Sequence, residues 1–283
     1  MTDIEKYEAY WNQWHLKWFN SLQDKNAADI SEWTIPQDKG GNECLTKEYF
    51  PEPYWGNIKS NSLKAIFLNI NPGLGGPEQN FINSNNPVVK NHYTKNNCTY
   101  SNTVLELSND KSNRTTKWMY KHRINWLNSF QKDAAFDISN TILCDLIPWH
   151  TKSKSGIADY TKKEEHQRLI LDQVILPLAR IAKTIEGDFA NSIIVRSSLL
   201  LDILNSSKLV AELISESREF VILKKGNSFS KMNSFLTEVE IIGTRFLIFS
   251  GGASMALPNI EYEVVPLGKA RPKTQNLKNF ILE

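Results

Sequence analysis

Polar residues that could take part in catalysis lie within or directly after two apolar runs of this sequence. Asn71-Pro72-Gly73 comes directly after the first run, and Asp145 lies within the second. A side-chain amide can position a water molecule, whereas a carboxylate in an apolar segment needs a partner or a function. His150 follows the second run and could stabilise a leaving anion or contact a phosphate group. These residues are therefore the first candidates for a catalytic or binding site.

Apolar runs that end in turn signals alternate along the chain with segments of helical periodicity. Expected strands cover residues 63–70, 140–147, 192–195, 219–223 and 245–250. Expected helices cover residues 3–24, 115–133, 162–183 with a kink at Pro177, 197–205, 208–217 and 230–238. Residues 83–113 are rich in Asn, Ser, Thr and Lys and are expected to form a long surface excursion. Apolar, non-alternating strands between helices predict an α/β fold with a mainly parallel central sheet.

The polar residues just after each expected strand define where a ligand would bind. In open parallel sheets, ligands lie beyond the carboxyl ends of the strands. The residues at these places are Asn71-Pro72-Gly73, Asp145 with Pro148-Trp149-His150, Arg196-Ser197-Ser198 and Ser250-Gly251-Gly252-Ala253-Ser254.

Composition excludes several classes of protein. The chain has 283 residues, of which 41% are hydrophobic and 23% charged, as in ordinary globular domains. Its three cysteines are far apart, so neither a disulfide framework nor a thiolate metal site is expected. No apolar run is long enough for a membrane span. We expect a cytoplasmic monomer without metal or cofactor. The net charge of +2 means that any DNA binding must come from local basic patches.

Two motifs resemble those of one enzyme family. Asn69-Ile70-Asn71-Pro72-Gly73 resembles the G-I-N-P-G motif of the mismatch-specific branch of the uracil-DNA glycosylase superfamily, with Asn69 in place of the first glycine. The likeness continues to Phe81. Residues 250–255, Ser-Gly-Gly-Ala-Ser-Met, are similar to the family's second motif, a loop that enters the DNA groove, but lack its usual proline and histidine forms.

The resemblance covers roughly residues 51–257 and carries implications for the fold. It implies three layers, with a central, mainly parallel four-stranded sheet flanked by helices. Residues 51–283 would form a glycosylase-like domain with an insertion at about 83–133. Residues 1–50 would be a helical extension packed on this core.

The resemblance also implies a chemistry, that of a cofactor-independent, monofunctional DNA glycosylase. Such an enzyme flips a base out of the duplex and holds water near the anomeric carbon. Asn71 would position this water, and Phe81 would lie close to the stacked base. Two purely structural alternatives remain: Asn71-Pro72-Gly73 could form a tight turn, and Phe81 could be a core residue.

Asp145 bears on the choice of base, because a residue at the end of this strand reads the flipped base in the resembling family. A carboxylate only accepts hydrogen bonds, and cytosine offers its N4 amino group as a donor. Gly73, Gly75 and Gly76 leave space where strict uracil enzymes place a tyrosine against position 5. Together these residues favour a 5-substituted cytosine, a base that occurs in phage DNA.

Other interpretations of the same residues remain. Asp145 could be structural, capping a helix or pairing with Lys or Arg, and His150 could be an ordinary surface histidine. The enzyme could instead be a uracil or thymine-mismatch repair glycosylase. A third possibility is a non-catalytic reader of modified or single-stranded nucleic acid.

A basic stretch and the late glycine-rich motif are the candidate DNA-binding surface. Residues 111–126 interleave basic residues with Trp118, Tyr120 and Trp126, so we expect the aromatics inside and the basic side on phosphates. An ordinary amphipathic helix is the alternative. The candidate DNA contacts are Arg114, Lys117, Lys121, Arg123, Ser250, Gly251, Gly252, Ser254 and Met255. A second basic run at residues 268–279 could be a basic arm or a solvated tail.

Overall fold

A computed structural model supplies the structure. It describes residues 1–23, 33, 50–59, 62–70, 86–94, 99–130, 136–149, 157, 159–206, 212–224, 234–251, 257–268 and 274–283.

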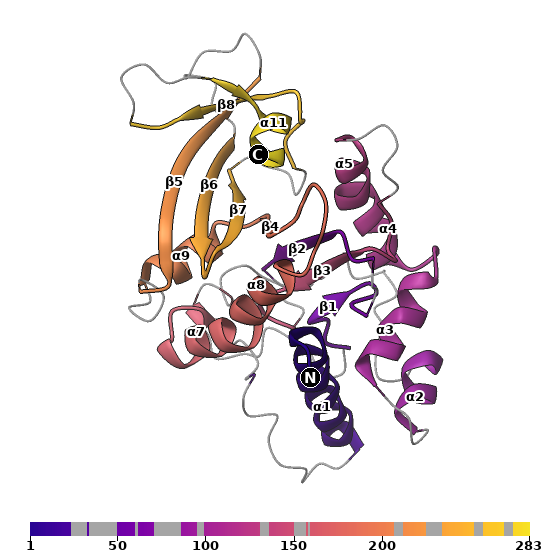
Figure 1. Cartoon of the computed structure of the whole chain (residues 1–283). Coiled ribbons are helices and arrows are strands. Elements are labelled where there is room, and N and C mark those ends of the chain that lie inside the picture. The colour runs from indigo at the N-terminus through magenta and orange to yellow at the C-terminus, as the bar shows by residue number, and fades with distance from the viewer. Residues whose placement is uncertain are drawn as a thin grey trace.

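One mixed sheet of nine strands runs through the described part of the chain (Figure 1). The strands are β1 (Tyr54–Trp55), β2 (Ala65–Asn69), β3 (Thr141–Asp145), β4 (Ser192–Val195), β5 (Ile214–Leu223), β6 (Ser234–Ile241), β7 (Thr244–Ser250), β8 (Glu263–Pro266) and β9 (Gln275–Asn276). Their order is β1-β3-β2-β4-β7-β6-β5-β8-β9. Neighbours among β3, β2, β4 and β7 pair in parallel, and all the other pairs are antiparallel. The α/β class is confirmed, but the expected four-stranded sheet is wrong.

The error in the sheet comes from two segments that were expected to be helices. They were expected at 208–217 and 230–238, but in the described part of these segments residues 214–217 belong to β5 and residues 234–238 to β6, and the two strands pair along most of their length. The first half of β5 is exposed and rich in Glu and Ser, so it lacks the apolar alternation of a half-buried strand. Cross-strand contacts stabilise this ribbon: Glu238 of β6 binds both Arg218 and Arg245. Such pairing depends on a partner strand, which local periodicity does not reveal.

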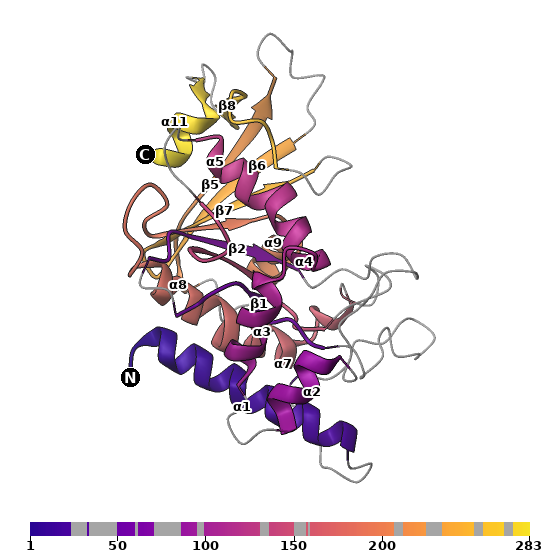
Figure 2. The ribbon, with the colours of Figure 1, turned by 90° about the vertical axis from the view of Figure 1, so that its right-hand side faces the viewer.

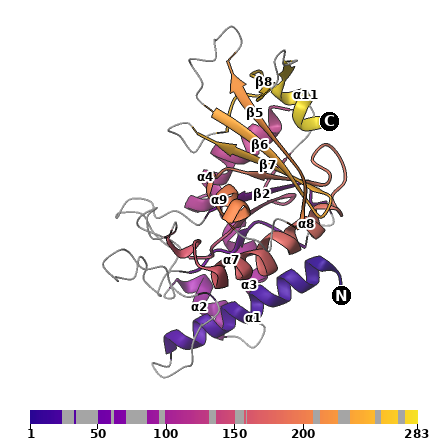
Figure 3. The same ribbon diagram turned by 90° about the vertical axis from the view of Figure 1, so that its left-hand side faces the viewer.

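Helices cover both faces of the parallel strands. The helices of the described ranges are α1 (Asp3–Gln23), α2 (Pro87–Thr94), α3 (Tyr100–Asn109), α4 (Arg114–Met119), the π-helical turn η1 (Tyr120–Ile124), α5 (Asn125–Asn128), α7 (Glu164–Ile170), the π-helical turn η2 (Leu171–Ile175), α8 (Leu176–Ala182), α9 (Leu199–Ser206) and α11 (Leu277–Leu282). Figure 2 shows α4 and α5 on one side of the sheet, and Figure 3 shows α7 and α8 on the other, with α1 along α8.

Specific contacts dock these helices on the sheet. On the α4–α5 face, the Trp55 indole N–H donates to Thr116 Oγ1 at 3.2 Å. The Trp126 ring packs edge-on against Phe67 and Phe249 of β2 and β7, with ring centroids 6.3 and 6.0 Å apart. On the opposite face, the Thr244 hydroxyl donates to a carbonyl of α8 at 2.8 Å. The α4–η1–α5 segment is therefore fixed over the strands that carry the candidate residues.

Two expectations about helices need correction, and a third concerns Pro177. The described part of residues 83–113 forms α2 and α3, whose buried faces pack beside α1, so it is not merely a surface excursion. The helix expected at 115–133 ends at Asn128. The helix expected at 162–183 is present as α7, η2 and α8, which follow one another without a break, and Pro177 lies in the first turn of α8, directly after η2. The wider turn before the proline accommodates a ring that an α-helix interior would exclude.

Aromatic side chains fix α1 against the segment that follows β3. Trp11, Trp14 and Trp18 of α1 are fully or almost fully buried. Trp14 meets Trp149 edge-on with ring centroids 5.3 Å apart, and the Trp149 indole N–H donates to the carbonyl of Trp33 at 2.9 Å. Aromatic pairs of this kind each contribute about 0.5–1.5 kcal/mol beyond the buried area. The chain after β3 is thus held in place up to residue 149.

The C-terminal residues belong to the fold. Residues 274–283 form β9 and α11, and Leu277, Phe280 and Ile281 of α11 are buried. A basic arm or solvated tail was expected over residues 268–279. For residues 274–279 this expectation is wrong, and residues 269–273 lie outside the described part. None of the helices in the described ranges has the length and apolarity needed to cross a bilayer.

Candidate functional site

The carboxyl ends of β3, β2, β4 and β7 meet at one edge of the sheet, where the candidate residues were expected. Asp145, Ser250 and Gly251 are described and lie at this edge. The other expected residues of the site lie outside the described residues: Asn71, Gly73, Phe81, His150, Gly252, Ser254 and Met255. The described part of the site therefore consists of the strand ends and the residues that contact them.

Asn69 and Asp145 are the last residues of two adjacent parallel strands and are paired in register. Paired residues of neighbouring strands project their side chains on the same face, here the face under α4 and α5. The backbone pairing continues beyond the strands, because the N–H of Leu146 donates to the carbonyl of Asn69 at 3.0 Å. Both side chains are almost fully buried, with exposed fractions of 6% for Asn69 and 3% for Asp145. An amide and a carboxyl group thus lie side by side at the strand ends.

Arg123 reaches this pair from above the sheet. Its guanidinium Nη2 donates to Asn69 Oδ1 at 3.0 Å. The guanidinium carbon lies 4.6 Å from the ring centre of Trp118 and 5.6 Å from that of Phe67. Such stacking suits the flat, weakly hydrated arginine cation. Arg123 is fully buried, which corrects the expectation that it belongs to an exposed DNA-binding face.

The inward direction of Arg123 follows from the π-helical turn η1. An extra residue in this turn shifts the helical phase, so residues after it do not continue the face begun by Arg114 and Lys117. Lys117 and Lys121 remain exposed, as does Arg114, whereas Arg123 points to the sheet. Turns of this kind are frequent at functional sites.

Burial dominates the electrostatics of this cluster. The pKa of Asp145 is raised well above its ordinary value by burial and further by Glu52, against the attraction of Arg123. Burial lowers the pKa of Arg123 to about 9, with Arg196 acting in the same direction and Asp145 opposing. Arg123 therefore keeps its charge at neutral pH. Within the described residues, Asp145 Oδ1 has no hydrogen-bond partner.

A buried carboxyl oxygen without a partner is costly unless a ligand satisfies it. The expectation that Asp145 caps a helix or pairs with a basic side chain has no support from hydrogen bonds or ion pairs of the described residues. What is present is attraction to Arg123, and it is weaker than the effect of burial. Asp145 is thus available to bind a hydrogen-bond donor.

Arg196 links the end of β4 to the end of β7. Its Nη1 donates to the carbonyl of Phe249 at 3.0 Å, and its Nη2 donates to the carbonyl of Gly251 at 2.7 Å. Gly251 is exposed and has φ of 78°, a left-handed conformation that glycine adopts easily. Arg196 therefore fixes the start of the loop that resembles the groove-entering motif.

Sequence reasoning missed Asn69, and it noted Arg196 without giving it a role. A signal existed for both, because each is a polar residue at the carboxyl end of a parallel strand. In the motif, Asn69 stands only as a replacement for glycine. Arg123 was identified, but on the wrong surface.

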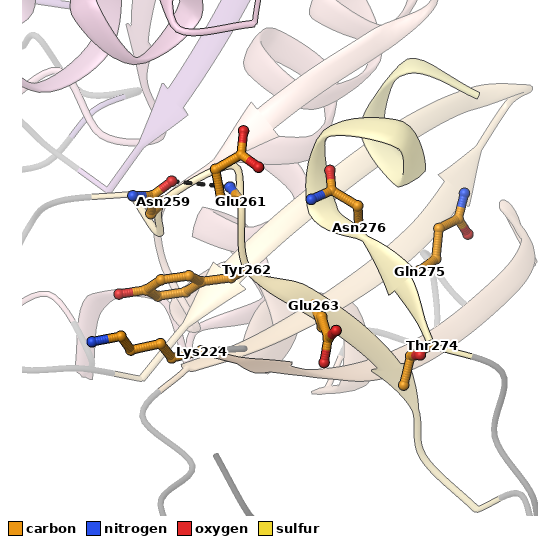
Figure 4. A pocket seen from close by; sticks show the side chains of 8 residues that line it. All are labelled: Lys224, Asn259, Glu261, Tyr262, Glu263, Thr274, Gln275 and Asn276. Atoms are coloured by element: carbon orange, nitrogen blue, oxygen red, sulfur yellow. Dashed lines mark hydrogen bonds between the residues drawn. The ribbon is translucent and has the colours of Figure 1, made fainter. Parts of the chain in front are cut away.

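A separate depression of about 420 Å³ lies at the β8–β9 end of the sheet (Figure 4). It is lined by Lys224, Asn259, Glu261, Tyr262, Glu263, Thr274, Gln275 and Asn276. Two carboxylates against one lysine make it unsuited to a phosphate group. It contains none of the residues singled out in the sequence. The described residues also contain no group of His, Cys, Asp and Glu that could hold a metal ion.

Comparison of the whole chain with family models, curated proteins and solved structures gives no match. The case for a function therefore depends on the buried Asn69, Arg123 and Asp145 cluster and on the sequence motifs next to it.

The stability of the protein offers a first prediction about Asp145. The pKa of Asp145 is raised in the folded state above the value near 3.9 of an unfolded chain. Below about pH 4 the group is protonated in both states, so its ionisation does not lower the free energy of unfolding. The cost of ionisation grows as the pH rises from there through the folded-state pKa. Asp145→Asn removes this cost, so we expect the variant to be more stable than wild type near pH 7.5, on the order of 1–3 kcal/mol.

Denaturant unfolding at pH 4.5, 6 and 7.5 measures this effect. The advantage of the variant should grow with pH, whereas Asp202→Asn on the exposed side of α9 should change little. A variant that is less stable than wild type near pH 7.5 would mean that Asp145 is held by a structural partner.

Proposed function

We propose that this chain is a DNA glycosylase that flips a 5-substituted cytosine out of foreign DNA and hydrolyses its bond to deoxyribose. The enzyme acts as a cytoplasmic monomer, without metal or cofactor. The observation that carries the proposal is the buried Asp145 carboxyl group, whose Oδ1 has no hydrogen-bond partner among the described residues. It lies at the end of β3, next to the strand β2 that the Asn71-Pro72-Gly73 segment follows.

In the proposed reaction, water attacks C1′ of the sugar while the bond from C1′ to N1 of the base breaks. The bonding electrons leave with the base, and the proton released by the water neutralises it. The products are a free base and an abasic site. Asn71 holds the water. Its side-chain amide can orient a water molecule through hydrogen bonds but is a poor general base. Asp145 accepts from the N4 amino group of the base.

Positive charge supports the departure of the base. Arg123 and Arg196 lie at the same edge of the sheet, close enough for the charge of Arg196 to lower the pKa of Arg123, and Arg123 is shielded from solvent. A cation in a water-poor site stabilises developing negative charge more strongly than one in water. The cluster thus supplies electrostatic stabilisation without the histidine that the late motif lacks.

A uracil glycosylase is the second candidate, and one observation favours it. Burial raises the pKa of Asp145 and so favours its protonated form over the carboxylate. A protonated carboxyl group has an O–H donor as well as an acceptor and could bond to O4 of uracil. Uracil therefore belongs among the tested substrates.

An excision assay tests both candidates. Duplexes and single strands carry 5-hydroxymethylcytosine, glucosylated 5-hydroxymethylcytosine, unmodified cytosine, uracil opposite guanine, or a thymine mismatch. Heating in alkali converts each abasic site into a strand break. We expect breaks at a modified cytosine and fewer at uracil. Tight binding to a modified duplex without breaks in any arm would instead indicate a non-catalytic reader.

The exposed basic residues of the α4–η1 segment should contact the phosphates of the DNA. Replacing Lys117 and Lys121 together by alanine should weaken binding to all sequences alike. The dependence of log affinity on log salt should fall by up to about 2, because each phosphate that is no longer neutralised lowers the slope by about one unit. Titrations of labelled duplex at several salt concentrations measure this slope.

A matched variant replaces Lys64 and Lys183, which are also exposed but lie at the opposite, amino edge of the parallel strands. It changes the net charge equally and should leave the slope nearly unchanged. Equal slopes for wild type and the Lys117/Lys121 variant would place this segment away from DNA.

A further inference from the structure

Asn69 presents a hydrogen-bond donor whose direction is fixed by Arg123. A guanidinium group only donates, so the atom of Asn69 that faces Arg123 Nη2 at 3.0 Å is the amide oxygen. The amide NH₂ group therefore points away from Arg123. It makes no hydrogen bond to another described residue, and it does not bond to the carboxyl group of Asp145 beside it.

A donor and an acceptor that stand side by side without bonding each other are suited to a shared third partner. The ends of neighbouring strands lie about 4.8 Å apart, so the two side chains can converge on adjacent atoms of one base edge. Cytosine offers a donor at N4 next to an acceptor at N3, the complement of an acceptor next to a donor. Uracil offers an acceptor at O4 next to a donor at N3. Its O4 would face the Asp145 acceptor, and its N3–H would face the Asn69 donor.

We propose that Asn69 is a second base-reading residue, which donates to N3 of a cytosine-type base while Asp145 accepts from N4. Arg123 is a positioning residue that holds the Asn69 amide in this orientation. The inference rests on the proposed function and narrows its substrate to cytosine-type bases. It adds one property that Asp145 alone does not give. The NH₂ group of Asn69 faces the N3–H of uracil, donor against donor, and so disfavours uracil whether or not Asp145 carries a proton.

Binding to a base without N3 tests the contact directly. Duplexes carry 5-hydroxymethylcytosine or its 3-deaza analogue, in which a C–H group replaces N3, on a 2′-fluoroarabino sugar that prevents excision. Wild type should bind the 3-deaza duplex roughly 10- to 100-fold more weakly, the ratio expected when a buried donor is left without its partner.

The informative variant is Asn69→Asp, because it keeps an oxygen for Arg123 and replaces the donor by an acceptor. It should bind the two duplexes within about threefold of each other, since it has no donor for N3 in either case. Asn140→Asp is the matched control: Asn140 is similarly buried and uses its side-chain oxygen for the N–H of Asp137, but it precedes β3 at the amino edge. This control should retain the full wild-type difference.

The role of Arg123 is to orient the Asn69 amide, so its test is the difference in binding between the two duplexes rather than the affinity for either one. Arg123→Met should reduce the difference between the two duplexes, because the amide is then free to turn, and Arg123→Lys should restore part of it. A purely structural role would weaken binding to both duplexes equally.

Failure of this inference is distinguishable from failure of the proposed function. Equal binding of both duplexes by a wild-type protein that excises modified cytosine would overturn the role of Asn69 and leave the function standing. A clear preference for the N3-containing duplex in a protein that excises nothing would support the role of Asn69 and reject the glycosylase.

Discussion

Asn71→Ala should lower the rate of base excision by about 10²-fold or more, the scale typical of a positioned catalytic group. The reason is that the alanine variant has no side-chain group to hold the attacking water near C1′. Binding to DNA should survive, because phosphate contacts supply most of the affinity. Single-turnover excision with enzyme in excess measures the chemical step, and titration of an uncleavable duplex measures binding.

Two further variants make this result specific. Asn71→Asp retains a group that can hold water and should keep more activity than the alanine variant. Asn91→Ala removes an exposed asparagine of α2 and should excise at the wild-type rate. Wild-type rates for Asn71→Ala would leave Asn-Pro-Gly as a simple turn after β2 and would remove the catalytic part of the proposal.

The parallel centre of the sheet could be predicted from sequence because each of its strands is a compact apolar run followed by turn signals. Residues 63–70, 140–147, 192–195 and 245–250 were expected as strands and correspond to β2, β3, β4 and β7. Strands buried on both faces are recognisable by composition alone. The aromatic spacing of residues 3–24 likewise predicted α1 nearly residue by residue.

Elements that depend on a distant partner could not be predicted in this way. The exposed half of β5 owes its extended form to pairing with β6, and its own residues lack the apolar alternation of a half-buried strand. The polar composition of residues 83–113 hid α3, although Tyr100, Val104 and Leu107 recur at helical spacing and are all buried. The Thr99 side chain caps this helix by accepting from the N–H of Asn102.

The candidate site was predictable in part for the same reasons. The burial of Asp145 followed from its place in an apolar strand. The direction of Arg123 did not, because a regular 3.6-residue period does not anticipate the π-helical turn that carries it. Asn69 gains its role from Arg123, which is 54 residues away in the sequence. Only the folded arrangement brings the amide, the guanidinium and the carboxyl group together.

Asp145→Asn should shift substrate preference from cytosine-type bases towards uracil by about 10- to 100-fold. A carboxylate accepts from the N4 amino group of cytosine and repels the O4 carbonyl of uracil. The amide restores a donor for O4 and can still turn its oxygen to N4, so the loss on cytosine should be partial. Leaving a buried polar group unpaired costs about 1–3 kcal/mol, which corresponds to this range of ratios.

The pH dependence of the preference separates Asp145 from the rest of the site. Burial raises the pKa of Asp145, so lowering the pH through that raised value converts the carboxylate into an acid with its own donor. Discrimination by wild type against uracil should therefore weaken as the pH falls. The Asn variant has no such proton to gain, and its ranking of the two bases should stay constant over the same range.

Competition between a modified-cytosine duplex and a uracil duplex in one tube measures the preference at each pH. The variant must be shown to remain folded by its unfolding transition, which is expected to lie above that of wild type near pH 7.5. If wild type already prefers uracil at high pH, where Asp145 is ionised, the carboxylate does not read N4. If the folded variant keeps the wild-type ranking at every pH, Asp145 does not touch the base, and the modified-cytosine proposal loses its main support.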